Sequence, residues 1–416
     1  MQSVEARTSP FESRLVPASA ARPGDDPIFA LNAQAQGRAA SGESILNSTL
    51  GALMTDEGRL AILPTVFEAF RRVPAERAAA YAPISGDREF LDAVIGDLFG
   101  DSRLSAMAVA AATPGGTGAC HHAIVNFLEP GQKLLTSSYY WGPYAILADH
   151  TRRGLETFSM FAQDGSFDVD AMETAIDRLI DEQGRVLLFL NTPCHNPTGF
   201  SLDDGDWERI VAVLERAGQR APVTLLLDLA YAKFARPDSI RWPRYVERLA
   251  GKVGLLFAWT ASKGFAQYGS RVGALIAIES DPVERDRIRN AIGYSCRGTW
   301  SNCNHLGMLA ITEVLTDPEL RSRCDAERDE LRRLLDERVD VFQDLAKKAG
   351  LRYPRYEGGF FVAVFTPDAE ATCTHMRERG VYVVPLDGAV RIALCCTRVA
   401  DLPRLVDALV AGIPPA

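Results

Sequence analysis

The stretch Val253–Gly264, VGLLFAWTASKG, predicts both the fold class and the position of a functional site. Its first seven residues form an apolar run without polar alternation, which is typical of a strand buried on both faces. Lys263 follows this run, with hydroxyls at Thr260 and Ser262 and with Arg271 eight residues further on. A lysine among phosphate-binding groups predicts a Schiff-base lysine that holds an aldehyde cofactor. A lysine considered alone is far more often a solvated loop residue, and the other motifs reverse that preference.

Similar apolar runs alternate with helical patterns from about residue 62 to 320, which predicts an α/β fold with a mostly parallel sheet sandwiched by helices. A long amphipathic helix is expected over residues 318–350, followed by a shorter α+β pattern. The expected strands are Met107–Ala112, Lys133–Thr136, Val186–Asn191, Val223–Asp228, Val253–Trp259 and Val272–Ile278, then Gly359–Phe365 and Val390–Cys395.

Composition limits the classes of function. The chain has 416 residues, of which 47% are hydrophobic, enough for a large core and a smaller second one. A net charge of -9 argues against a nucleic-acid partner. No apolar run reaches the roughly 20 residues that span a bilayer. The eight cysteines show no CxxC spacing, so we expect no metal site and a cytoplasmic enzyme with reduced thiols.

Five unusual features each follow an apolar run: the glycine turn Thr113–Ala119, Trp141, Asn196, Asp228 and Lys263. Ligands of open α/β sheets bind outside the carboxyl ends of the strands, so these features predict one shared site. The glycine turn lacks both the P-loop ending and the GxGxxG spacing, which favours a single phosphate monoester over a nucleotide. A glycine turn without a ligand is the alternative.

The other features have structural alternatives too. Asp228, at the end of a buried run, suits a protonated pyridine nitrogen, or else caps a helix. Asn196 suits a phenolic oxygen, or else opens an ordinary turn, and Trp141 suits a flat heteroaromatic ring, or else a core. Arg391, inside an apolar strand, suits a carboxylate held by two hydrogen bonds. Arg297 lies in an expected polar-aromatic loop, and a surface salt bridge is its alternative.

With these residues in place, the chain resembles the aspartate/aromatic amino acid aminotransferases, which are class I aminotransferases of pyridoxal-phosphate fold type I. The resemblance covers about residues 26–409. Its motifs agree in order and type: Leu50-Gly51-Ala52, Thr55–Gly58, Tyr81–Gly86, Thr113–Ala119, Asn196–Gly199, Asp228 to Tyr231, Ser262-Lys263, Arg271–Gly273 and Arg391.

The resemblance implies a large cofactor-binding domain at residues 62–325, a small domain made of 26–61 and 326–416, and a flexible leader at 1–25. The catalytic residues would be Lys263, Asp228 and Tyr231, with Lys263 forming the Schiff base with pyridoxal 5'-phosphate and then carrying the proton. The cofactor would be bound by Gly115, Gly116, Thr117, Trp141, Asn196, Asp228, Tyr231, Thr260, Ser262, Lys263, Arg271 and, from a second subunit, Tyr81. The substrate would meet Gly51, Trp141, Asn196, Arg391 and the partner subunit's Arg297, which implies a homodimer with shared sites.

Lysine acts as a base only when neutral, so the pKa of Lys263 must fall below its usual value of about 10.4. We expect nearby cations, Arg271 and the ring nitrogen, to lower it. Three positions depart from the family pattern: Cys303-Asn304-His305 in place of Pro-containing sequence, Leu53 in place of an aromatic residue, and Tyr144 in place of a histidine that supports the pyridine-binding aspartate. We expect the first two at the mouth of the substrate pocket.

The sequence therefore predicts a transaminase that exchanges the amino group between an aromatic or dicarboxylic L-amino acid and a 2-oxo acid such as 2-oxoglutarate. Decarboxylation, elimination or replacement, or carbon–carbon bond formation with the same cofactor is the alternative. A non-catalytic regulator is a third possibility, disfavoured by the acidic composition and by a leader too short for a DNA-binding domain.

Overall fold

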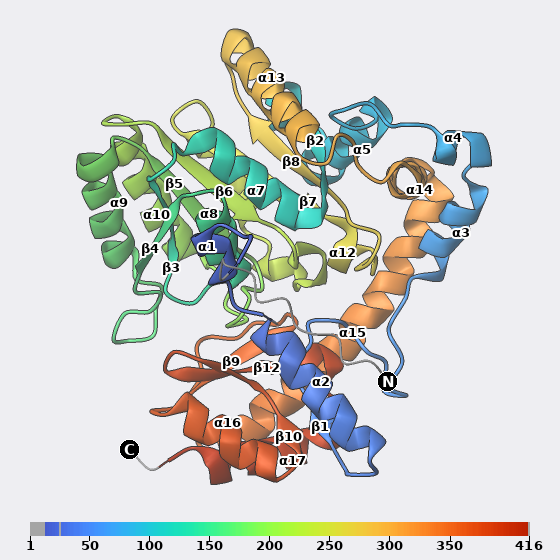
Figure 1. Cartoon of the computed structure of the whole chain (residues 1–416), viewed down its shortest axis with the longest axis vertical. Helices are drawn as coiled ribbons and strands as arrows, with labels where there is room; N and C mark the ends of the chain where they lie inside the picture. The colour runs from blue at the N-terminus through green and yellow to red at the C-terminus, as the bar shows by residue number, and fades with distance from the viewer. Residues whose placement is uncertain (1–12, 25, 415–416) are drawn as a thin grey trace, which may run out of the picture.

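The computed structural model describes residues 13–24 and 26–414, and within them a seven-stranded sheet forms the centre of the larger body (Figure 1). The strand order is β2-β8-β7-β6-β5-β3-β4, with β8 antiparallel to β2 and β7 and the remaining pairs parallel. The prediction of a mostly parallel sheet is thus confirmed. The strands are β2 (Ala108–Pro114), β3 (Lys133–Ser137), β4 (Gly154–Phe158), β5 (Val186–Asn191), β6 (Val223–Asp228), β7 (Gly254–Thr260) and β8 (Val272–Ile278).

Three of the predicted strands, β5, β6 and β8, have the predicted bounds, and β2, β3 and β7 differ by one or two residues at their ends. The sequence analysis missed β4. This strand lies at the edge of the sheet beside β3 and is largely half-buried. A search for continuous apolar runs finds strands that are covered on both faces, and β4 is not one of them.

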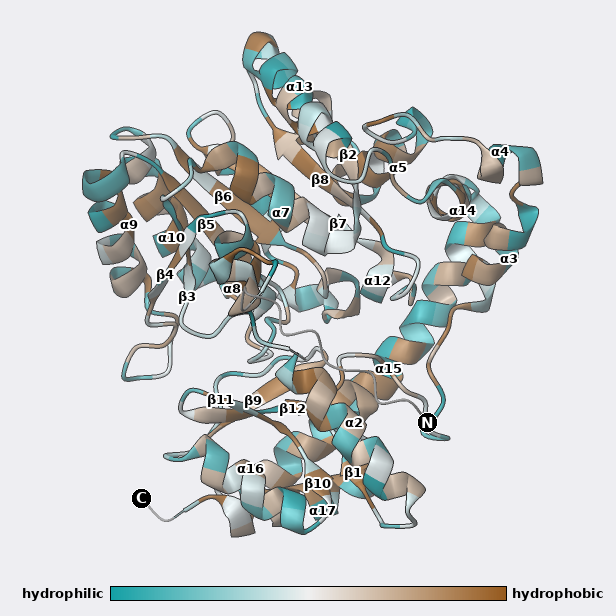
Figure 2. Cartoon of the chain, in the orientation of Figure 1, coloured by the Kyte–Doolittle hydropathy of each residue, from teal (hydrophilic) through white to brown (hydrophobic). Residues whose placement is uncertain are grey.

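Helices cover both faces of the sheet, because alternate residues of each strand point to opposite sides. In β5, Leu187 and Phe189 face one apolar cluster, while Leu188 and Leu190 face another. The first cluster is closed by α7 (Gly115–Phe127), α8 (Pro143–His150) and α13 (Pro282–Gly298). The second is closed by α5 (Arg88–Phe99), α9 (Val169–Gln183), α10 (Asp204–Gly218), α11 (Trp242–Leu249) and α14 (His305–Thr316). Figure 2 shows the central strands as hydrophobic and the outer side of α9 as hydrophilic.

The smaller body combines both ends of the chain (Figure 1). A three-stranded antiparallel sheet has the order β11-β12-β9, and β1 pairs in parallel with β10 across more than 330 residues of sequence. The elements are α2 (Pro27–Ala40), β1 (Leu46–Asn47), β9 (Phe361–Phe365), α16 (Ala369–Glu378), β10 (Val381–Tyr382), β11 (Val384–Leu386), β12 (Ala389–Ala393) and α17 (Leu402–Gly412). This arrangement supports our proposal of a small domain made of residues 26–61 and 326–416 beside a large domain at 62–325.

The long helix α15 (Pro318–Lys348) is confirmed close to its predicted bounds. It runs from the larger body, beside α3 and α14, to the smaller one (Figure 1). The remaining helices are α1 (Pro17–Ala20), α3 (Pro64–Arg72), α4 (Ala75–Ala79), α6 (Leu104–Met107) and α12 (Ala261–Gly264). Helix α1 falls in the expected leader, of which residues 1–12 and 25 lie outside the described residues. Within residues 13–24 and 26–414, we find no helix that is both long and apolar enough to cross a membrane.

Two predicted strands of the smaller body are shorter than expected. Strand β9 begins at Phe361, after two glycines with positive φ. Strand β12 ends at Ala393, and Leu394–Cys396 form a 3-10 turn instead of continuing the strand. After Ala393, the carbonyl oxygen of Cys395 accepts from Arg338 on α15 at 2.7 Å and from the backbone N–H of Met54 at 2.9 Å, so its partners come from these segments and not from a neighbouring strand.

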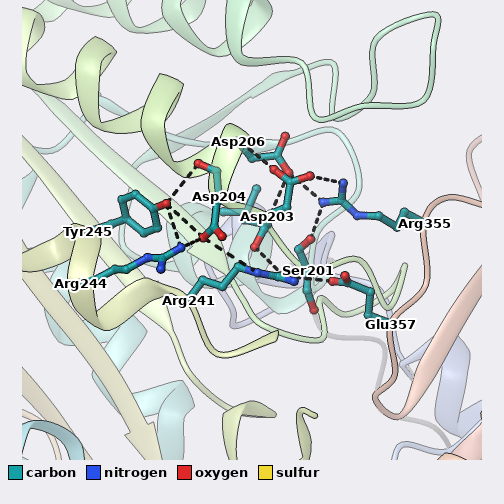
Figure 3. A network of polar contacts seen from close by, with 10 residues as sticks. Ser201, Asp203, Asp204, Asp206, Arg241, Arg244, Tyr245, Arg355 and Glu357 are labelled. Carbon is teal, nitrogen blue, oxygen red and sulfur yellow. Dashed lines mark hydrogen bonds and ion pairs between the residues drawn. The ribbon is translucent and has the colours of Figure 1, made fainter. Parts of the chain in front are cut away.

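A network of ion pairs joins the segment before β9 to the start of α10 (Figure 3). Arg355 donates from Nη1 to Asp203 at 2.5 Å and from Nη2 to Asp206 at 2.8 Å. Arg241 lies 3.5 Å from the carboxylate of Glu357. These ion pairs are partly buried, and Asp206 is buried. We regard their main effect as fixing where the segment that leads into β9 docks.

Arg338 is a fully buried cation that holds three segments together. Besides the carbonyl of Cys395, its guanidinium binds the carbonyl oxygen of Met54 at 2.8 Å and the carboxylate of Asp56 at 2.6 Å. Removal of the Arg338 side chain would leave a cavity and take the donor from the carbonyl oxygens of Met54 and Cys395.

We therefore expect Arg338→Ala to destabilise the protein by roughly 2–5 kcal/mol, the usual cost of truncating a large buried side chain to alanine. Arg333→Ala, an exposed arginine on the same helix, is the matched control and should stay within about 0.5 kcal/mol of wild type. Thermal unfolding of the two variants checks this, and equal midpoints would contradict the structural role of Arg338.

Candidate active site

A cavity of about 140 Å³ lies at the carboxyl ends of the central strands, where the sequence predicts the site. Most of the expected cofactor residues line it. The lining residues are Gly116, Thr117, Trp141, Asn191, Asn196, Asp228, Ala230, Tyr231, Thr260, Ser262, Lys263 and Arg271.

The amino end of α7 forms one wall of this cavity. Gly116 and Thr117 lie in the first turn, where the N–H groups of a helix have no partner within it. Gly115 lies just behind, with a φ of +71°, and a Cβ atom there would come within 2.5 Å of Arg271 Nη2. Glycine at 115 therefore permits the guanidinium of Arg271 to reach the turn.

The hydroxyls expected to bind phosphate gather around α12. Thr260 accepts a hydrogen bond from the backbone N–H of Ser262 at 3.1 Å and donates to the Ser262 hydroxyl at 2.9 Å. Arg271 Nη1 donates to the same hydroxyl at 3.3 Å. Together with the start of α7, two hydroxyls and a guanidinium make a donor set suited to a phosphate dianion.

Asp228 is the last residue of β6, and its side chain is buried, at 6% exposed. One carboxylate oxygen accepts from the Tyr144 hydroxyl at 2.5 Å, and the other accepts from the backbone N–H of Ala230 at 3.1 Å. Burial raises the pKa of Asp228, and the bond from Tyr144 acts against that rise. The helix-cap alternative does not apply, because Tyr231 rather than Asp228 precedes the next helical turn.

Asn196 and Tyr231 meet in the cavity, since Asn196 Nδ2 donates to the Tyr231 hydroxyl at 3.3 Å. Asn191, which the sequence analysis missed, aligns this pair with Asp228. Its side chain accepts from the backbone N–H of Asn196 at 2.7 Å and donates to the backbone carbonyl of Asp228 at 2.9 Å. Asn191 ends β5, so the strand-end rule that selected Asp228 would have found it.

Lys263 occupies α12 and is largely enclosed by aromatic rings. Its Nζ lies 5.0 Å from the ring centre of Tyr268 and 5.8 Å from that of Tyr231. Burial lowers the pKa of Lys263 to about 8, and Arg271 lowers it further, while Cys395 and Asp228 act in the opposite direction. The expected depression is therefore present, but burial and not a neighbouring cation is its largest cause.

Arg391 lies in β12, as predicted, and is 6% exposed. Its Nη2 donates to the carbonyl oxygen of Thr49 at 2.6 Å, and its guanidinium carbon lies 4.5 Å from the ring centre of Phe361. The Nε atom is buried and has no hydrogen-bond partner among the described residues. An unpaired buried donor of this kind suits an incoming carboxylate.

Phe361 places Arg391 beside the cavity, because its ring also lies 5.7 Å from that of Tyr231. A Cβ atom on Gly51 would come within 2.6 Å of this ring, so the glycine allows the segment after β1 to approach Phe361 closely. The sequence carried no signal for Phe361 or for Tyr268, because only the fold brings them to the site.

Two expected residues lie away from the cavity of their own chain. Tyr81 is 91% exposed, and Arg297 is exposed and donates to the Ser301 hydroxyl at 2.7 Å. Arg297 occupies the last turn of α13 and not a loop, which corrects the prediction. The helical pattern continues to Gly298, and the polar-aromatic sequence begins only after it.

The three departures from the family pattern have different surroundings. Leu53 is 1% exposed and packs in the apolar cluster that includes Tyr231, so its side chain is core and does not line the expected mouth of the pocket. His305 lies 2.6 Å from Asp87 and within hydrogen-bonding distance, 2.8 Å, of the carbonyl oxygen of Ala80, next to Tyr81. Tyr144 takes up the contact with Asp228.

The donor set fits pyridoxal phosphate. Hydroxyls, backbone N–H groups and Arg271 suit the phosphate, Asp228 suits a ring nitrogen that carries a proton, and Lys263 supplies an amine of lowered pKa. A larger hollow of about 560 Å³ lies at the opposite, amino ends of β5, β6 and β7, and none of the expected site residues lines it. Among the described residues, no group of three or more His, Cys, Asp or Glu could hold a metal ion.

Comparisons with known proteins identify the family of the chain. The family model "Aminotransferase class I and II" matches residues 45–409. The aspartate aminotransferase of Pseudomonas aeruginosa is 28% identical over 406 residues, covering 92% of this chain and 96% of that protein. The solved structure of an aminotransferase from Anaerococcus prevotii is 29% identical with a TM-score of 0.92, covering 97% of this chain and 100% of that one.

A third relative bears on the cofactor. The aromatic-amino-acid aminotransferase of Burkholderia pseudomallei, solved covalently bound to pyridoxal phosphate, is 25% identical with a TM-score of 0.80, covering 96% of this chain and all of that chain. The fold type I architecture, the pyridoxal phosphate cofactor and transamination, each expected from the sequence, are confirmed. The chain belongs to the aminotransferase class I and II family.

Proposed function

We propose that this transaminase exchanges the amino group between an aromatic or dicarboxylic L-amino acid and a 2-oxo acid such as 2-oxoglutarate. The observation that carries the proposal is the convergence of the Lys263 amine, the Asp228 carboxylate and the Arg271 guanidinium on one cavity, with Arg391 beside it. Relatives named for aspartate and for aromatic amino acids support both substrate classes.

Pyridoxal phosphate, when bound, supplies a cationic ring that stabilises negative charge on the α-carbon of the amino acid. Asp228 would keep the ring nitrogen protonated, and Trp141 would lie against the ring. Asn196 and Tyr231 would donate to the ring oxygen. The phosphate would be held by Gly116, Thr117, Thr260, Ser262 and Arg271, next to Gly115, and by the partner subunit's Tyr81.

Lys263 has two tasks in this proposal. It would hold the cofactor through its amine, and its neutral amine would take the proton from the α-carbon of the substrate. A pKa of about 8 leaves part of the amine neutral near pH 7, whereas the usual value of about 10.4 would leave almost none. Burial by Tyr231 and Tyr268 is what makes the lysine a usable base.

Arg391 fixes the direction of attack. Its Nε and the remaining N–H groups grip the α-carboxylate, which turns the α-hydrogen toward Lys263. Gly51 keeps the segment beside Phe361 close to the substrate. A distal carboxylate, as in glutamate, is met by the partner subunit's Arg297.

The shared residues require a homodimer, which we propose on the positions of Tyr81 and Arg297. Both are exposed and neither lines the cavity of its own chain, so a second copy is needed to use them. We also propose a cytoplasmic location. All eight cysteines, which lie in the described part of the chain, are free thiols, as is usual in a reducing compartment.

Decarboxylation, elimination or carbon–carbon bond formation on the same cofactor is not favoured, because the relatives reported above are aminotransferases. The departure from the family pattern at Cys303-Asn304-His305 gives no support to one of these other reactions. His305 bonds to the segment before Tyr81 and does not line the cavity.

The pKa of Lys263 predicts how fast the protein without cofactor captures pyridoxal phosphate. Only the neutral amine reacts, so the capture rate should rise with pH, reach half its maximum near pH 8 and level off about one unit above that. Stopped-flow absorbance over pH 6 to 10.5 measures this, with Lys263→Ala as the blank. A rate that keeps climbing to pH 10 would mean that the lysine is solvated and not buried.

The two arginines predict a split in substrate preference. Arg391→Ala should lower kcat/KM for every amino acid, whereas Arg297→Ala should lower it for glutamate and aspartate alone. Each loss should be roughly 100-fold, since a charge-assisted bond contributes about 1.5–3 kcal/mol. Turnover of glutamate, aspartate, phenylalanine and tyrosine is the assay. Equal losses for phenylalanine in both variants would refute the assignment of Arg297.

Mixed dimers test whether Arg297 acts across the subunit interface. A hybrid of Lys263→Ala and Arg297→Ala chains contains one site with an intact lysine, which receives its arginine from the other chain. We expect this hybrid to regain glutamate turnover at about half the wild-type level. A hybrid of Lys263→Ala and Arg391→Ala is the control and should stay impaired, because Arg391 serves its own chain. Failure of the first hybrid would place Arg297 outside the shared site.

A further inference from the structure

His305 contacts both ends of the segment that carries Tyr81. The segment runs from Ala80, just after α4, to Asp87, just before α5. His305 is the first residue of α14, where its Nδ1 lies 2.8 Å from the carbonyl oxygen of Ala80 and its Nε2 lies 2.6 Å from Oδ2 of Asp87. A carbonyl oxygen only accepts, so Nδ1 donates in the first contact. One imidazole ring therefore joins the start of the segment to its end.

The position of Tyr81 depends on this backbone. Its side chain is 91% exposed, so packing within its own chain does not hold it. Among the described residues, no backbone N–H donates to the carbonyl oxygen of Ala80, and His305 supplies its hydrogen bond. The far part of the segment is fixed separately, since the backbone N–H of Ala112 in β2 donates to the carbonyl oxygen of Ser85 at 2.8 Å. His305 thus fixes the end of the segment that lies next to Tyr81.

The first turn of α14 is itself fixed on the larger body. Asn304 caps the helix by accepting from the backbone N–H of Gly307 at 3.0 Å, and it donates to the carbonyl oxygen of Ser270 at 2.8 Å. A Cβ atom on Gly307 would lie 2.4 Å from the side chain of Val272, so the turn packs directly on the start of β8. Ser270 and Val272 are the two chain neighbours of Arg271. The turn is therefore held beside the phosphate-binding arginine of its own chain.

The contacts of His305 are partly shielded from water. Its side chain is 12% exposed, and that of Asp87 is 19% exposed. Polar contacts in such surroundings are stronger than contacts at an open surface. His305 does not line the cavity of its own chain, so any effect on a cofactor must pass through Tyr81.

We propose that His305 is a positioning residue that holds Tyr81 in place for the cofactor phosphate of the partner subunit's site. The inference rests on the proposed function, in which Tyr81 serves the second subunit. His305 would then act on the neighbouring site and not on the cavity beside it. The departure from the family pattern at His305, which the sequence analysis expected at the mouth of the substrate pocket, acquires a role in cofactor binding instead.

Mixed dimers separate the two sites, because each hybrid is built with one site that retains Lys263. In the trans hybrid, a wild-type chain pairs with a chain carrying both Lys263→Ala and His305→Ala, so the intact lysine receives Tyr81 from the altered chain. In the cis hybrid, Lys263→Ala and His305→Ala lie on different chains, so the intact lysine receives Tyr81 from a chain that has His305. Both hybrids contain the same two substitutions and differ only in how they are distributed.

The dissociation constant of pyridoxal phosphate is measured by titrating each hybrid, freed of cofactor, and recording the absorbance of the lysine-bound form. Only the site with Lys263 gives this signal. We expect the trans hybrid to bind roughly 5- to 30-fold more weakly than the cis hybrid, which is part of the roughly 10- to 100-fold that a hydrogen bond to a charged group contributes. The cis hybrid should match a hybrid of wild-type and Lys263→Ala chains. At saturating cofactor, the cis and trans hybrids should turn over glutamate at equal rates, which a folding defect would prevent.

Two conservative variants keep the test decisive. His305→Asn retains an N–H near the position of Nδ1, so in the trans arrangement it should bind the cofactor within about threefold of wild type. His305→Gln directs its amide toward Asp87 and lacks the donor to Ala80, so it should bind as weakly as His305→Ala. If the His305→Ala chain fails to fold, these two variants test the Ala80 contact directly, and equal affinities for them would overturn the proposal.

Equal dissociation constants for the cis and trans hybrids would also overturn it, as would weaker binding in the cis hybrid alone. Tyr81→Phe in the trans arrangement sets the full loss, roughly 10- to 100-fold. If that variant binds the cofactor as tightly as wild type, the proposed role of Tyr81 fails, and that of His305 fails with it. Absence of oxo-acid product from the wild-type enzyme with all four amino acids would refute transamination instead. The binding measurements contain no amino acid, so these failures are distinguishable.

Discussion

The burial of two opposite charges at the carboxyl edge of an apolar sheet is the constraint on which the rest of the structure depends. Asp228 and Lys263 follow strands β6 and β7, which are adjacent and parallel, so the two groups open into one cavity. An ionised carboxylate in this position is costly unless something pairs with it. Tyr144 and the N–H of Ala230 meet part of that need. We propose that the cofactor ring nitrogen meets the rest.

The same burial gives each group the property its chemistry requires. Burial lowers the pKa of Lys263 to about 8 and raises the pKa of Asp228. The hydrogen bonds from Tyr144 and Ala230 oppose the rise in the pKa of Asp228. The guanidinium of Arg391 is held by Thr49 and Phe361, and its buried Nε has no partner among the described residues. We propose that this N–H binds the substrate carboxylate. The scaffold outside the site, including Arg338 and the Arg355 network, holds the smaller body so that Arg391 stays in reach.

The sequence predicted the parts of this arrangement that depend on local pattern. Continuous apolar runs identified β5, β6 and β8 with correct bounds, because strands covered on both faces leave no polar alternation. The strand-end rule then placed Asp228 and Lys263 in one site. Edge strand β4 was missed because one side of it meets solvent, and Cys395 was assigned to a strand because nothing local reveals the bonds that its carbonyl oxygen accepts from Arg338 and Met54.

Contacts between distant segments could not be predicted. Phe361 and Tyr268 reach Arg391, Tyr231 and Lys263 only through the packing of the smaller body and the turn after α12, and neither carries a distinctive motif. Leu53 was expected at the pocket mouth because of its place in a motif, yet the backbone turns its side chain into the core. The sequence analysis noted that Tyr144 departs from the family pattern. Its hydrogen bond to Asp228 is visible only in the structure.

Borohydride reduction of the protein loaded with pyridoxal phosphate, followed by peptide mass spectrometry, tests the central claim most directly. The account predicts that a reduced cofactor adduct is found on Lys263, the lysine whose pKa burial lowers to about 8. An adduct on a different lysine, or an unmodified Lys263, would contradict it.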